Sequence, residues 1–527
     1  MVLQKLKQKL GKAVDPLFGS HLTSSRPSAT ELSAVDLALP EMSVEQEVYQ
    51  YRKQRGVNLG SWFVQERWIC ESTFRYAQLP GQSDLDIARG RNAKEVLEEH
   101  WDRWVQEDDW RWLREHGFNS VRIPIGYYHL CGVDPSVIVD TDFQSYGQVY
   151  AGAWSRITQA IETAHRHGIG VLIDLHAAPG KQNPDAHAGT SEPAKFFAER
   201  RHRTHCTRIL CSLVANLSKF AISHSPPLPN IVGVELLNEP RPSSDDELMK
   251  WYTTTIKELR HIDGSIPIYV GDCWRLDQYA NYINSLFASH RVTGLLALDH
   301  HLYRCFTDSD THASASEHAL ALRERTPGGF SNAAEKLGRA YGGLVVGEWS
   351  AALNPRSLRG EENEVKNYVL AQLDLYEKTC AGWWFWTYKK EKRPDRGWCL
   401  LDAVNAGVFP RKIGMTATKW VSGDEARREN VREKTGKQAY DNHCGHWSQY
   451  PGQYEHERFA VGYLEGWNDA YQFLGSGVGS GSVSEVGFVA ARANRRGVSE
   501  SRSYWEYEHG FLQGVGAARR DFEEQYC

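Results

Sequence analysis

The stretch Ile231-Val232-Gly233-Val234-Glu235-Leu236-Leu237-Asn238-Glu239-Pro240 decides the fold. It begins as an apolar run rich in β-branched residues and ends at a proline, which is typical of a buried strand. Its last residues are an amide, a carboxylate and the proline. Polar groups at the carboxyl end of a buried strand are typical of the active-site edge of a (β/α)8 barrel. The alternative is an Asn-Glu-Pro turn that caps the next helix.

Seven further apolar segments share this strand pattern and alternate with amphipathic helical segments. All-apolar strands that alternate with helices indicate parallel strands covered on both faces. An open, doubly wound sheet is the alternative, but no phosphate-binding glycine motif follows any strand. The sequence therefore predicts the α/β class and a closed (β/α)8 TIM barrel over residues 49–412. The seven strands are expected at 56–60, 121–125, 171–176, 266–272, 295–303, 344–349 and 382–387, and the main helices at 93–116, 153–167, 195–223, 245–262, 330–341 and 361–379.

The segments on either side of the barrel differ from it in composition. Residues 1–48 predict a leader, and within residues 1–18 leucines and valine recur at helical spacing opposite four lysines. Such a basic amphipathic helix either lies on an anionic membrane or packs on the protein itself. Residues 413–527 predict a small, mainly helical appendage. It contains three diverged Gly-aromatic units, starting at residues 462, 487 and 510, whose glycines we expect at close helix crossings.

Overall composition excludes several classes of partner. The 527 residues carry a formal net charge of -5, so there is no electrostatic reason to expect a nucleic acid. The sequence contains no apolar run of about 18 residues, so we expect no membrane span. Lysines interrupt the apolar residues near the N-terminus, so we expect no signal peptide there. The 10 cysteines are scattered, which indicates free thiols in a reducing compartment. We therefore expect a cytoplasmic protein, with or without peripheral membrane contact through residues 1–18; its oligomeric state stays open.

Chemically useful side chains stand at the ends of the predicted strands. Glu239 and Glu348 lie on the fourth and seventh strands and should face each other across the barrel mouth, about 5 Å apart. Glycosidic bond cleavage needs such a pair, because one carboxyl protonates the leaving oxygen while the other attacks the anomeric carbon. Cations and donors should surround the attacking carboxylate, and Arg122 and Tyr303 are the right chemical types. Asn238 is suited to bind a sugar 2-hydroxyl.

Other functions remain open for these residues. His176 and His301 also fit the role of buried structural histidines. Asp299-His300-His301 contains metal-binding residue types, but no further ligand follows at a zinc-like spacing, so we expect neither a metal nor a cofactor. A catalytically silent barrel that binds carbohydrate as a scaffold is the alternative to an enzyme.

The chain resembles clan A, family 5 glycoside hydrolases, close to the fungal exo-β-1,3-glucanase (glucan 1,3-β-glucosidase) branch. The resemblance covers Arg55 to Pro410 and rests on seven motifs in order. These are Arg55-Gly56-Val57-Asn58-Leu59-Gly60, Gly117-Phe118-Asn119-Ser120-Val121-Arg122-Ile123-Pro124, Asp174-Leu175-His176-Ala177-Ala178-Pro179-Gly180, Leu237-Asn238-Glu239-Pro240, Asp299-His300-His301-Leu302-Tyr303, Gly347-Glu348-Trp349 and Gly382-Trp383-Trp384-Phe385-Trp386.

The resemblance implies a retaining β-glucosidase, exo-acting on β-1,3-glucan-type oligosaccharides or related β-glucosides. It implies that Glu239 is the general acid/base and Glu348 the nucleophile. Glu66 matches an acidic residue that grips the terminal glucose, Trp68 its aromatic neighbour, and Phe306 one half of an aromatic clamp around the next sugar. The family's remaining signature positions are Arg122, His176, Asn238, His301, Tyr303 and Trp386.

The chain also departs from the exoglucanase pattern. In the loop after the third strand, where those enzymes carry a phenylalanine and an asparagine, this chain has Pro184-Asp185-Ala186-His187, so half of the clamp is missing. The secreted relatives have signal peptides and no counterpart of the appendage. An intracellular β-glucosidase acting on a glucolipid, either a steryl or a ceramide glucoside, is therefore the alternative substrate assignment.

Overall fold

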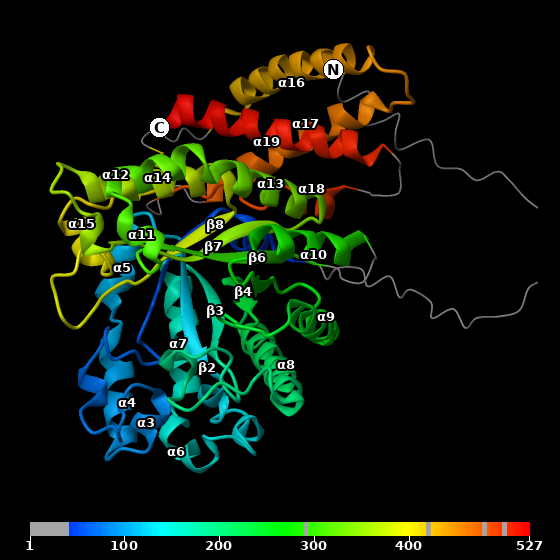
Figure 1. The fold of residues 1–527 in the computed structure, drawn as a ribbon. Coiled ribbons are helices and arrows are strands. Elements are labelled where there is room, and N and C mark those ends of the chain that lie inside the picture. Colours follow the sequence, from blue (N-terminus) through cyan, green and yellow to red (C-terminus); the bar gives the residue numbers. More distant parts are fainter. Residues whose placement is uncertain (1–41, 289–293, 418–422, 477–481, 498–502) are drawn as a thin grey trace, which may run out of the picture. The chain divides into compact units, whose positions relative to one another are not determined.

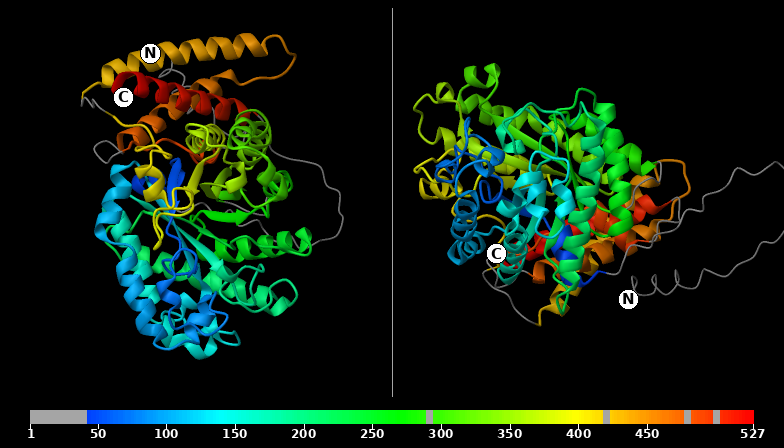
Figure 2. Two further views of the ribbon diagram at one scale, coloured as in Figure 1. Left: turned by 60° about the vertical axis from the view of Figure 1, so that its left-hand side comes forward. Right: turned by 90° about the horizontal axis from the view of Figure 1, so that it is seen from below.

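Eight parallel strands form a closed barrel in the computed structural model, which describes residues 42–288, 294–417, 423–476, 482–497 and 503–527. Each strand pairs with its neighbour in sequence, and β1 pairs with β8 to close the ring. The predicted (β/α)8 barrel is confirmed, and Figures 1 and 2 show its strands inside a layer of helices. The strands are β1 Gln54–Asn58, β2 Ser120–Gly126, β3 Gly170–Ala177, β4 Ile231–Glu235, β5 Ile268–Gly271, β6 Leu296–Arg304, β7 Gly343–Leu353 and β8 Gly382–Phe385.

Helices follow the strands in the expected alternation. Short 3-10 helices lie in the loops, at Ser72–Phe74, Tyr127–Leu130, Pro135–Ile138, Gln144–Tyr146, Ala186–Ala188 and Pro355–Ser357. The α-helices of the barrel region are α2 Val44–Tyr51, α3 Asp84–Ala88, α4 Ala93–Trp104, α5 Glu107–Glu115, α6 Gly147–Tyr150, α7 Ala153–Arg166, α8 Arg200–Ile222, α9 Asp245–Ile262, α10 Leu276–Ala288, α11 Asp308–His312, α12 Ala315–Glu324, α13 Thr326–Arg339, α14 Glu364–Thr379 and α15 Leu400–Asn405.

The single helix expected at 93–116 is two helices, α4 and α5. Val105 interrupts them because its backbone is extended, with φ -122° and ψ 123°. Gln106 then opens α5, where its backbone N–H donates to the side chain of Asp109 at 2.8 Å. The hydrophobic pattern runs through the break, so periodicity alone does not reveal it.

The strands are buried over almost their whole length, because helices cover the outside and side chains fill the inside. Every residue of β2 and β3 is buried. The interior nevertheless holds charged groups: the side chains of Arg122, Asp174 and Glu235 are all 0% exposed. A charge in such a place needs a partner, and these three side chains provide partners for one another.

The described chain begins inside the segment that the sequence assigned to a leader. Ser43 caps α2 by accepting a hydrogen bond from the backbone N–H of Gln46 at 3.1 Å, so residues 44–48 of the predicted leader belong to a helix. The predicted basic helix and the membrane contact through residues 1–18 lie outside the described residues. None of the described helices has the length and apolar character needed to cross a membrane.

The chain divides into two compact units, and the larger contains more than the barrel segment. It comprises residues 42–418 together with Phe473–Arg492 and the last two residues. Residues 473–492 were assigned from the sequence to the appendage. They pair with the start of β1, where Lys53 N–H donates to Glu485 O at 2.7 Å and Arg55 Nη2 lies 2.6 Å from Glu485 Oε2.

The smaller unit is helical, as predicted for the C-terminal region. Its helices are α16 Glu425–Trp447, α17 His456–Ser476 and α19 Tyr504–Tyr526, and α18 Val489–Arg496 ends within it. The helices α17 and α19 cross closely at glycines from two of the three Gly-aromatic units. A Cβ on Gly466 would lie 2.2 Å from Phe511 O, and one on Gly510 would lie 2.1 Å from Phe459 O. The remaining Gly-aromatic repeat begins at Gly487, which belongs to the larger compact unit and packs there against Lys53.

Candidate active site

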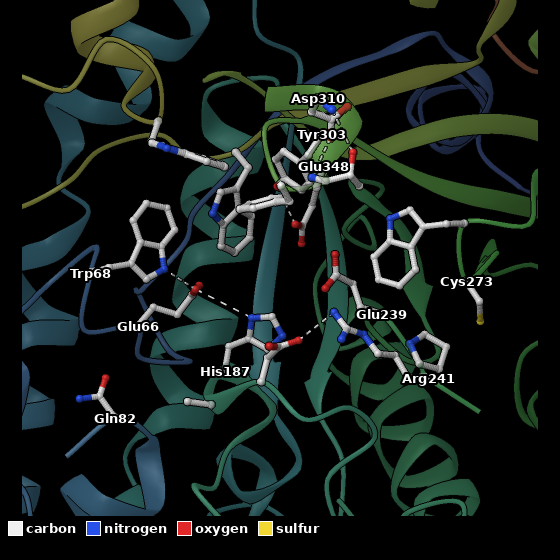
Figure 3. Close-up of a pocket in the computed structure, with 18 of the residues that line it drawn as sticks. Glu66, Trp68, Gln82, His187, Glu239, Arg241, Cys273, Tyr303, Asp310 and Glu348 are labelled. Carbon is white, nitrogen blue, oxygen red and sulfur yellow. Dashed lines mark hydrogen bonds and ion pairs between the residues drawn. The ribbon is translucent and has the colours of Figure 1, made fainter. Parts of the chain in front are cut away.

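Glu239 and Glu348 meet at the carboxyl ends of the strands. Glu239 follows β4 and Glu348 lies on β7, and both point into the pocket of Figure 3. One carboxylate oxygen of each, together with a ring nitrogen of His301, lies within 4.8 Å of the others. Retaining glycosidases hold their two carboxyl groups about 5–5.5 Å apart, whereas inverting enzymes leave room for a water molecule between them. The spacing therefore fits retention.

The carboxylate of Glu348 is bound on both oxygens. Arg122 Nη1 donates to Oε1 at 3.0 Å, and the hydroxyl of Tyr303 donates to Oε2 at 2.8 Å. Burial raises the pKa of Glu348 to about 7, although the charges of His301 and Arg122 oppose the rise. Both oxygens are thus positioned, and the group titrates close to neutral pH.

Glu239 has an uncommon backbone conformation and a cationic neighbour. Its φ is 42°, in the left-handed region that side chains other than glycine rarely adopt, and such residues cluster at functional sites. His301 Nδ1 lies 2.9 Å from Glu239 Oε1. Burial alone would raise the pKa of Glu239, but the hydrogen bond from His301 and the charges of His301 and His187 lower it to about 2.

His301 contacts both carboxylates. Besides its bond to Glu239, its Nδ1 lies 3.5 Å from Glu348 Oε2, and its Nε2 lies 3.5 Å from Asp299 Oδ2. Burial would lower the pKa of His301, but the charges of Glu348 and Asp299 raise it well above its usual value. The imidazole is therefore held as a cation between acidic groups.

Arg122 lies beneath the two carboxylates and orients their neighbours. Its Nη2 donates to Asn238 Oδ1 at 2.9 Å and lies 3.1 Å from Asp174 Oδ2. Its Nε donates to Glu235 Oε2 at 2.8 Å and its Nη1 to Asn58 Oδ1 at 3.0 Å. The guanidinium thus fixes the amide of Asn238, the residue before Glu239, and contacts one oxygen of each of two buried carboxylates.

The orientation of the His176 ring is fixed by a contact with the carboxylate of Asp174. Its Nδ1 lies 2.7 Å from Asp174 Oδ2, and its ring is parallel to that of Trp386, 5.7 Å away. Asn238 Nδ2 lies 3.4 Å from its Nε2. Both ring nitrogens of the buried His176 therefore have a polar neighbour.

The pocket above these groups has a volume of about 1230 Å³. Seven of the eleven residues proposed from the sequence line it: Glu66, Trp68, Glu239, Tyr303, Phe306, Glu348 and Trp386. The other four, Arg122, His176, Asn238 and His301, are buried and contact the lining residues from below. The structure therefore gathers all eleven around one cavity.

Glu66 and Trp68 form one wall of the pocket. Trp68 Nε1 donates to Glu66 Oε2 at 2.8 Å, so the indole holds the carboxylate in place. His187 Nδ1 lies 3.9 Å from the same oxygen (Figure 3). Burial would lower the pKa of His187, but its interaction with Glu66 raises it to about 9.

Sequence reasoning missed two aromatic residues of the pocket, Trp274 and Trp398. Trp398 packs against Trp68, Tyr303 and Phe306, with ring centroids 5.4, 5.5 and 6.0 Å away. Trp274 follows β5 and is 44% exposed. Its place shortly after a strand end is the signal that could have identified it.

The loop that replaces half of the aromatic clamp is polar. Within the segment Pro184-Asp185-Ala186-His187, Oδ2 of Asp185 lies 3.2 Å from Nη2 of Arg241. The guanidinium of Arg241 in turn lies over the ring of Trp274, 5.5 Å from its centroid. Phe306, the other half of the clamp, is 71% exposed.

Comparison with known proteins assigns the chain to a family. The model of cellulases of glycosyl hydrolase family 5 matches residues 90–392, more than half of the chain. The chain belongs to glycosyl hydrolase family 5. This family 5 glycoside hydrolase also matches, over residues 428–522, the model of the C-terminal domain of glucan 1,3-beta-glucosidase 3.

Curated relatives of this family 5 enzyme extend over nearly its whole length. Glucan 1,3-beta-glucosidase 3 of Schizosaccharomyces pombe is 30% identical over 481 residues, which cover 88% of this chain and 95% of that protein. An uncharacterized glycosyl hydrolase of Saccharomyces cerevisiae is 26% identical, with 89% and 91% covered. Among solved structures, rutinosidase from Aspergillus niger shares the fold, with a TM-score of 0.53 at 19% identity, covering 68% of this chain and 98% of that one.

Proposed function

We propose that the protein is a retaining, exo-acting β-glucosidase for β-1,3-glucan-type oligosaccharides. The observation that carries this proposal is the approach of the Glu239 and Glu348 oxygens to within 4.8 Å across a pocket with a tryptophan wall. The substrate class rests on the relatives, because glucan 1,3-beta-glucosidase 3 of S. pombe and enzymes of Schwanniomyces occidentalis and Kluyveromyces lactis carry the name glucan 1,3-beta-glucosidase.

In this mechanism Glu348 is the nucleophile. Arg122 and Tyr303 each donate to one of its oxygens, which stabilises the carboxylate and aims it at the anomeric carbon. Attack forms a covalent glucosyl–Glu348 ester while the bond to the leaving oxygen breaks. Water then attacks the same carbon, and the ester bond breaks to release glucose with the original configuration.

Glu239 is the general acid and then the general base. It must carry a proton when the leaving oxygen departs, although its pKa in the free protein is low and that of Glu348 is higher. The pair therefore holds one proton that must move to Glu239 when substrate binds. His301 Nδ1 is within 2.9 Å of Glu239 and 3.5 Å of Glu348, so its N–H is placed to pass this proton between them.

The remaining residues bind the sugar in this proposal. Asn238, fixed by Arg122, faces the position of the 2-hydroxyl next to the acid/base. Glu66, Trp68 and His176 bind the terminal glucose, while Trp386 forms the floor. Phe306 offers an exposed ring to the next sugar, with Trp398 packed behind it.

Two other readings of the sequence are not favoured by the comparisons. These are a glucosidase for steryl or ceramide glucosides and an inactive carbohydrate-binding scaffold. The bound carboxylate pair argues against the scaffold, because binding alone needs no such arrangement.

We also propose a cytoplasmic location, which the ten free cysteines support. Membrane contact through residues 1–18 stays a prediction.

The proposal is tested with purified wild-type protein on laminarin oligosaccharides, an aryl β-glucoside and a steryl glucoside. We expect turnover of the first two, with β-glucose as the first product by NMR. Glu348→Gln should lose activity by at least ~10⁴-fold, whereas Glu239→Gln should lose about 10²–10⁴-fold and less on substrates with a good leaving group. Glu95→Gln, an exposed carboxylate on α4, is the matched control.

The roles of the two carboxylates are separated by azide. With azide and an activated aryl glucoside, Glu239→Gln should form β-glucosyl azide, because azide replaces water on the covalent intermediate. α-Glucose as the first product of the wild type, or full activity of Glu348→Gln, would reject the mechanism. Turnover of steryl glucoside alone would reject the substrate class.

A further inference from the structure

An ion pair lies next to Glu239 at the mouth of the barrel. Asp185 lies in the loop that follows β3, and Arg241 is the second residue after Glu239. Oδ2 of Asp185 lies 3.2 Å from Nη2 of Arg241, and both residues line the pocket. A carboxylate oxygen of Asp185 also lies within 4.8 Å of one of Glu239. The pair therefore borders the group that protonates the leaving oxygen in the proposed mechanism.

The ion pair lies on the leaving-group side of the pocket. In Figure 3, Glu239 and Arg241 lie on the right, whereas Glu66 and Trp68, which the proposed function gives to the terminal glucose, lie on the left. A general acid must lie within hydrogen-bond distance of the oxygen that it protonates. The leaving oxygen is therefore beside Glu239, and the leaving group extends away from Glu66, over the ion pair.

The loop that carries Asp185 is tied to the segment that carries Glu239. Nδ2 of Asn183 donates to the carbonyl oxygen of Glu239 at 3.1 Å, and Oδ1 of Asn183 accepts the backbone N–H of Asp185 at 3.0 Å. The backbone N–H of Arg241 donates to the carbonyl oxygen of Gln182 at 3.2 Å. These bonds hold the ion pair at a fixed position relative to the acid/base, as a preorganised binding site requires.

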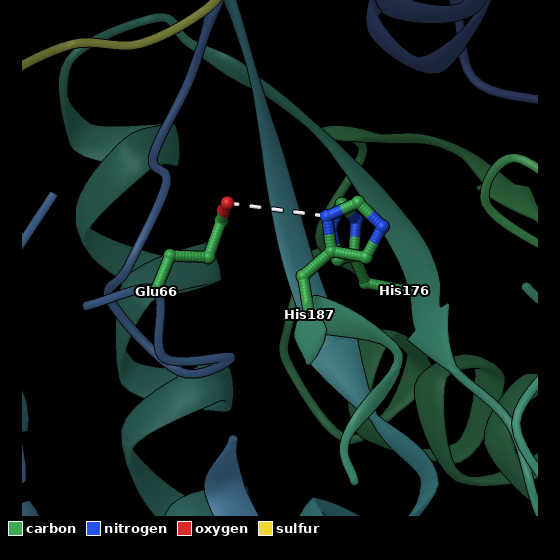
Figure 4. A group of neighbouring side chains, drawn as sticks. All are labelled: Glu66, His176 and His187. Atoms are coloured by element: carbon green, nitrogen blue, oxygen red, sulfur yellow. Dashed lines mark ion pairs between the residues drawn. The ribbon is translucent and has the colours of Figure 1, made fainter. Parts of the chain in front are cut away.

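The same loop also reaches the terminal-glucose side of the pocket. His187, two residues after Asp185, directs its Nδ1 toward Oε2 of Glu66, 3.9 Å away (Figure 4). Its Nε2 lies 3.4 Å from Nδ2 of Asn183. One short loop thus lines both halves of the pocket, with His187 facing the terminal sugar and Asp185 facing the leaving group.

Trp274 forms a wall beside the ion pair. The guanidinium of Arg241 lies over its ring, 5.5 Å from the centroid, yet the residue remains 44% exposed. Its backbone and that of Cys273 are left-handed, with φ 59° and 51°, which is a strained conformation for such residues. Asp272 fixes this turn, because its Oδ1 accepts the N–H of Trp274 at 2.8 Å while its Oδ2 lies 2.7 Å from Nδ1 of His300.

The ion pair is half-exposed and keeps hydrogen-bonding capacity. The side chains of Asp185 and Arg241 are 45% and 48% exposed. A guanidinium has five N–H donors and a carboxylate has about four acceptor sites, and the contact between Nη2 and Oδ2 uses few of them. Neighbouring hydroxyls of a sugar can donate to the carboxylate and accept from the guanidinium. An apolar group offers no such bonds, so covering the pair with it costs free energy.

We propose that Asp185, Arg241 and Trp274 bind the first unit of the leaving group and select a hydroxylated leaving group, such as a second sugar, over an apolar one. The indole packs against the ring of that sugar, and the ion pair binds its hydroxyls. This inference rests on the proposed function for the place of the leaving oxygen, and it names the residues that choose the leaving group.

The selection is measured on three substrates with the same glucosyl group: laminaribiose, hexyl β-glucoside and β-glucosyl fluoride. The fluoride is too small to reach the ion pair, so it reports the cleavage step alone. In Arg241→Leu, kcat/KM on laminaribiose should fall by about 10- to 100-fold, because hydrogen bonds from a charged group are lost. The value for hexyl β-glucoside should not fall, and that for the fluoride should change by less than about 3-fold.

The matched control is Arg201→Leu, the same change at an exposed arginine that pairs with Glu199 beside α8. It should match the wild type on all three substrates. Asp185→Asn, which removes the charge that holds Arg241, should lower kcat/KM on laminaribiose in the same direction as Arg241→Leu.

A binding measurement separates the leaving-group site from the chemistry. Calorimetry on Glu348→Gln measures the affinities for laminaribiose and for glucose without turnover. Adding Arg241→Leu to this variant should weaken the binding of laminaribiose by about 10-fold or more and leave the affinity for glucose unchanged.

An equal fall of kcat/KM on all three substrates, or an unchanged ratio of laminaribiose to hexyl β-glucoside turnover, would overturn the proposed selection. A laminaribiose affinity that does not depend on Arg241 would overturn it as well. If the wild type hydrolysed none of the three substrates but bound laminaribiose through Arg241, the site would stand and the proposed function would be rejected instead.

Discussion

Arg122 Nη1 lies 3.0 Å from Oε1 of Glu348, and the hydrogen bond crosses the interior of the barrel. The two residues come from β2 and β7, which are not neighbours in the sheet. The side chain of Arg122 is 0% exposed, and its other donors reach further acidic and amide groups. A charge network that positions the proposed nucleophile is therefore also part of the barrel core.

Replacing Arg122 by methionine should both destabilise the protein and abolish its activity. The substitution leaves Asp174, Glu235 and Glu348 buried without their shared cation, and loss of one partner of a buried ion pair costs about 3–5 kcal/mol. Urea unfolding followed by circular dichroism measures the free energy of unfolding. Arg103→Met is the control, because Arg103 and Glu99 form an exposed pair on α4 and its loss should cost less than about 0.5 kcal/mol. Equal stability of the two variants would contradict this account.

Activity should fall as pH rises through about 7. The mechanism needs one proton on the pair Glu239–Glu348, and the free protein loses that proton near the pKa of Glu348, about 7. Below that pH the proton is present, so kcat/KM should stay high down to the much lower pKa of Glu239, about 2, wherever the fold survives. The pH profile of kcat/KM on an aryl glucoside measures this limb. A profile that rises through pH ~7 would have the wrong sign.

Tyr303→Phe should lower kcat and move the alkaline limb upward. The change removes the 2.8 Å hydrogen bond to Glu348, and a hydrogen bond to a charged group contributes about 1.5–3 kcal/mol, or roughly 10- to 100-fold in rate. Because this bond lowers the pKa of Glu348, its loss should raise that pKa. Steady-state kinetics across pH measures both effects, with the exposed Tyr450→Phe as control. If kcat fell but the alkaline limb of the pH profile stayed in place, Tyr303 would not influence the pKa of Glu348, contrary to this prediction.

Gly466→Ala should loosen the helical unit. The added Cβ would lie 2.2 Å from the carbonyl oxygen of Phe511, so α17 and α19 must move apart, at a cost of about 1–3 kcal/mol. Hydrogen–deuterium exchange of the two helices should become faster. Gly445→Ala in α16 meets nothing within 4 Å and should instead stabilise its helix by about 0.5–1 kcal/mol. Unchanged hydrogen–deuterium exchange in Gly466→Ala would show that the crossing of α17 and α19 accommodates the added methyl group, and it would contradict this prediction.

The fold was predictable because each strand is buried on both faces and therefore almost wholly apolar. The helix predicted at 245–262 has those bounds in the structure. The break at Val105 was missed because it depends on one extended backbone conformation, which leaves no mark in the hydrophobic pattern. The return of residues 473–492 to the barrel was missed because it depends on pairing with residues some 430 positions away, as between Arg55 and Glu485.

Strand patterns alone predicted the candidate site only at the strand ends, whereas the loop residues Glu66, Trp68 and Phe306 followed from the family resemblance. Glu239 and Glu348 follow from the rule that chemistry stands at strand ends, and their approach follows from closure of the barrel. Trp398 and the neighbours of His187 lie in loops, whose course is set by local turns and side-chain contacts. The 3.9 Å approach of His187 to Glu66 joins two such loops, so only the folded chain reveals it.

The route of the C-terminal region bears on how this architecture is inherited. The polypeptide leaves the barrel unit after residue 418, rejoins it at Phe473 and departs again after Arg492. A module attached by a single tether is gained or lost through one recombination event, or shed by one proteolytic cut. Here such an event would also remove Glu485, and with it the 2.6 Å ion pair to Arg55 and the backbone hydrogen bond to Lys53 at the start of β1.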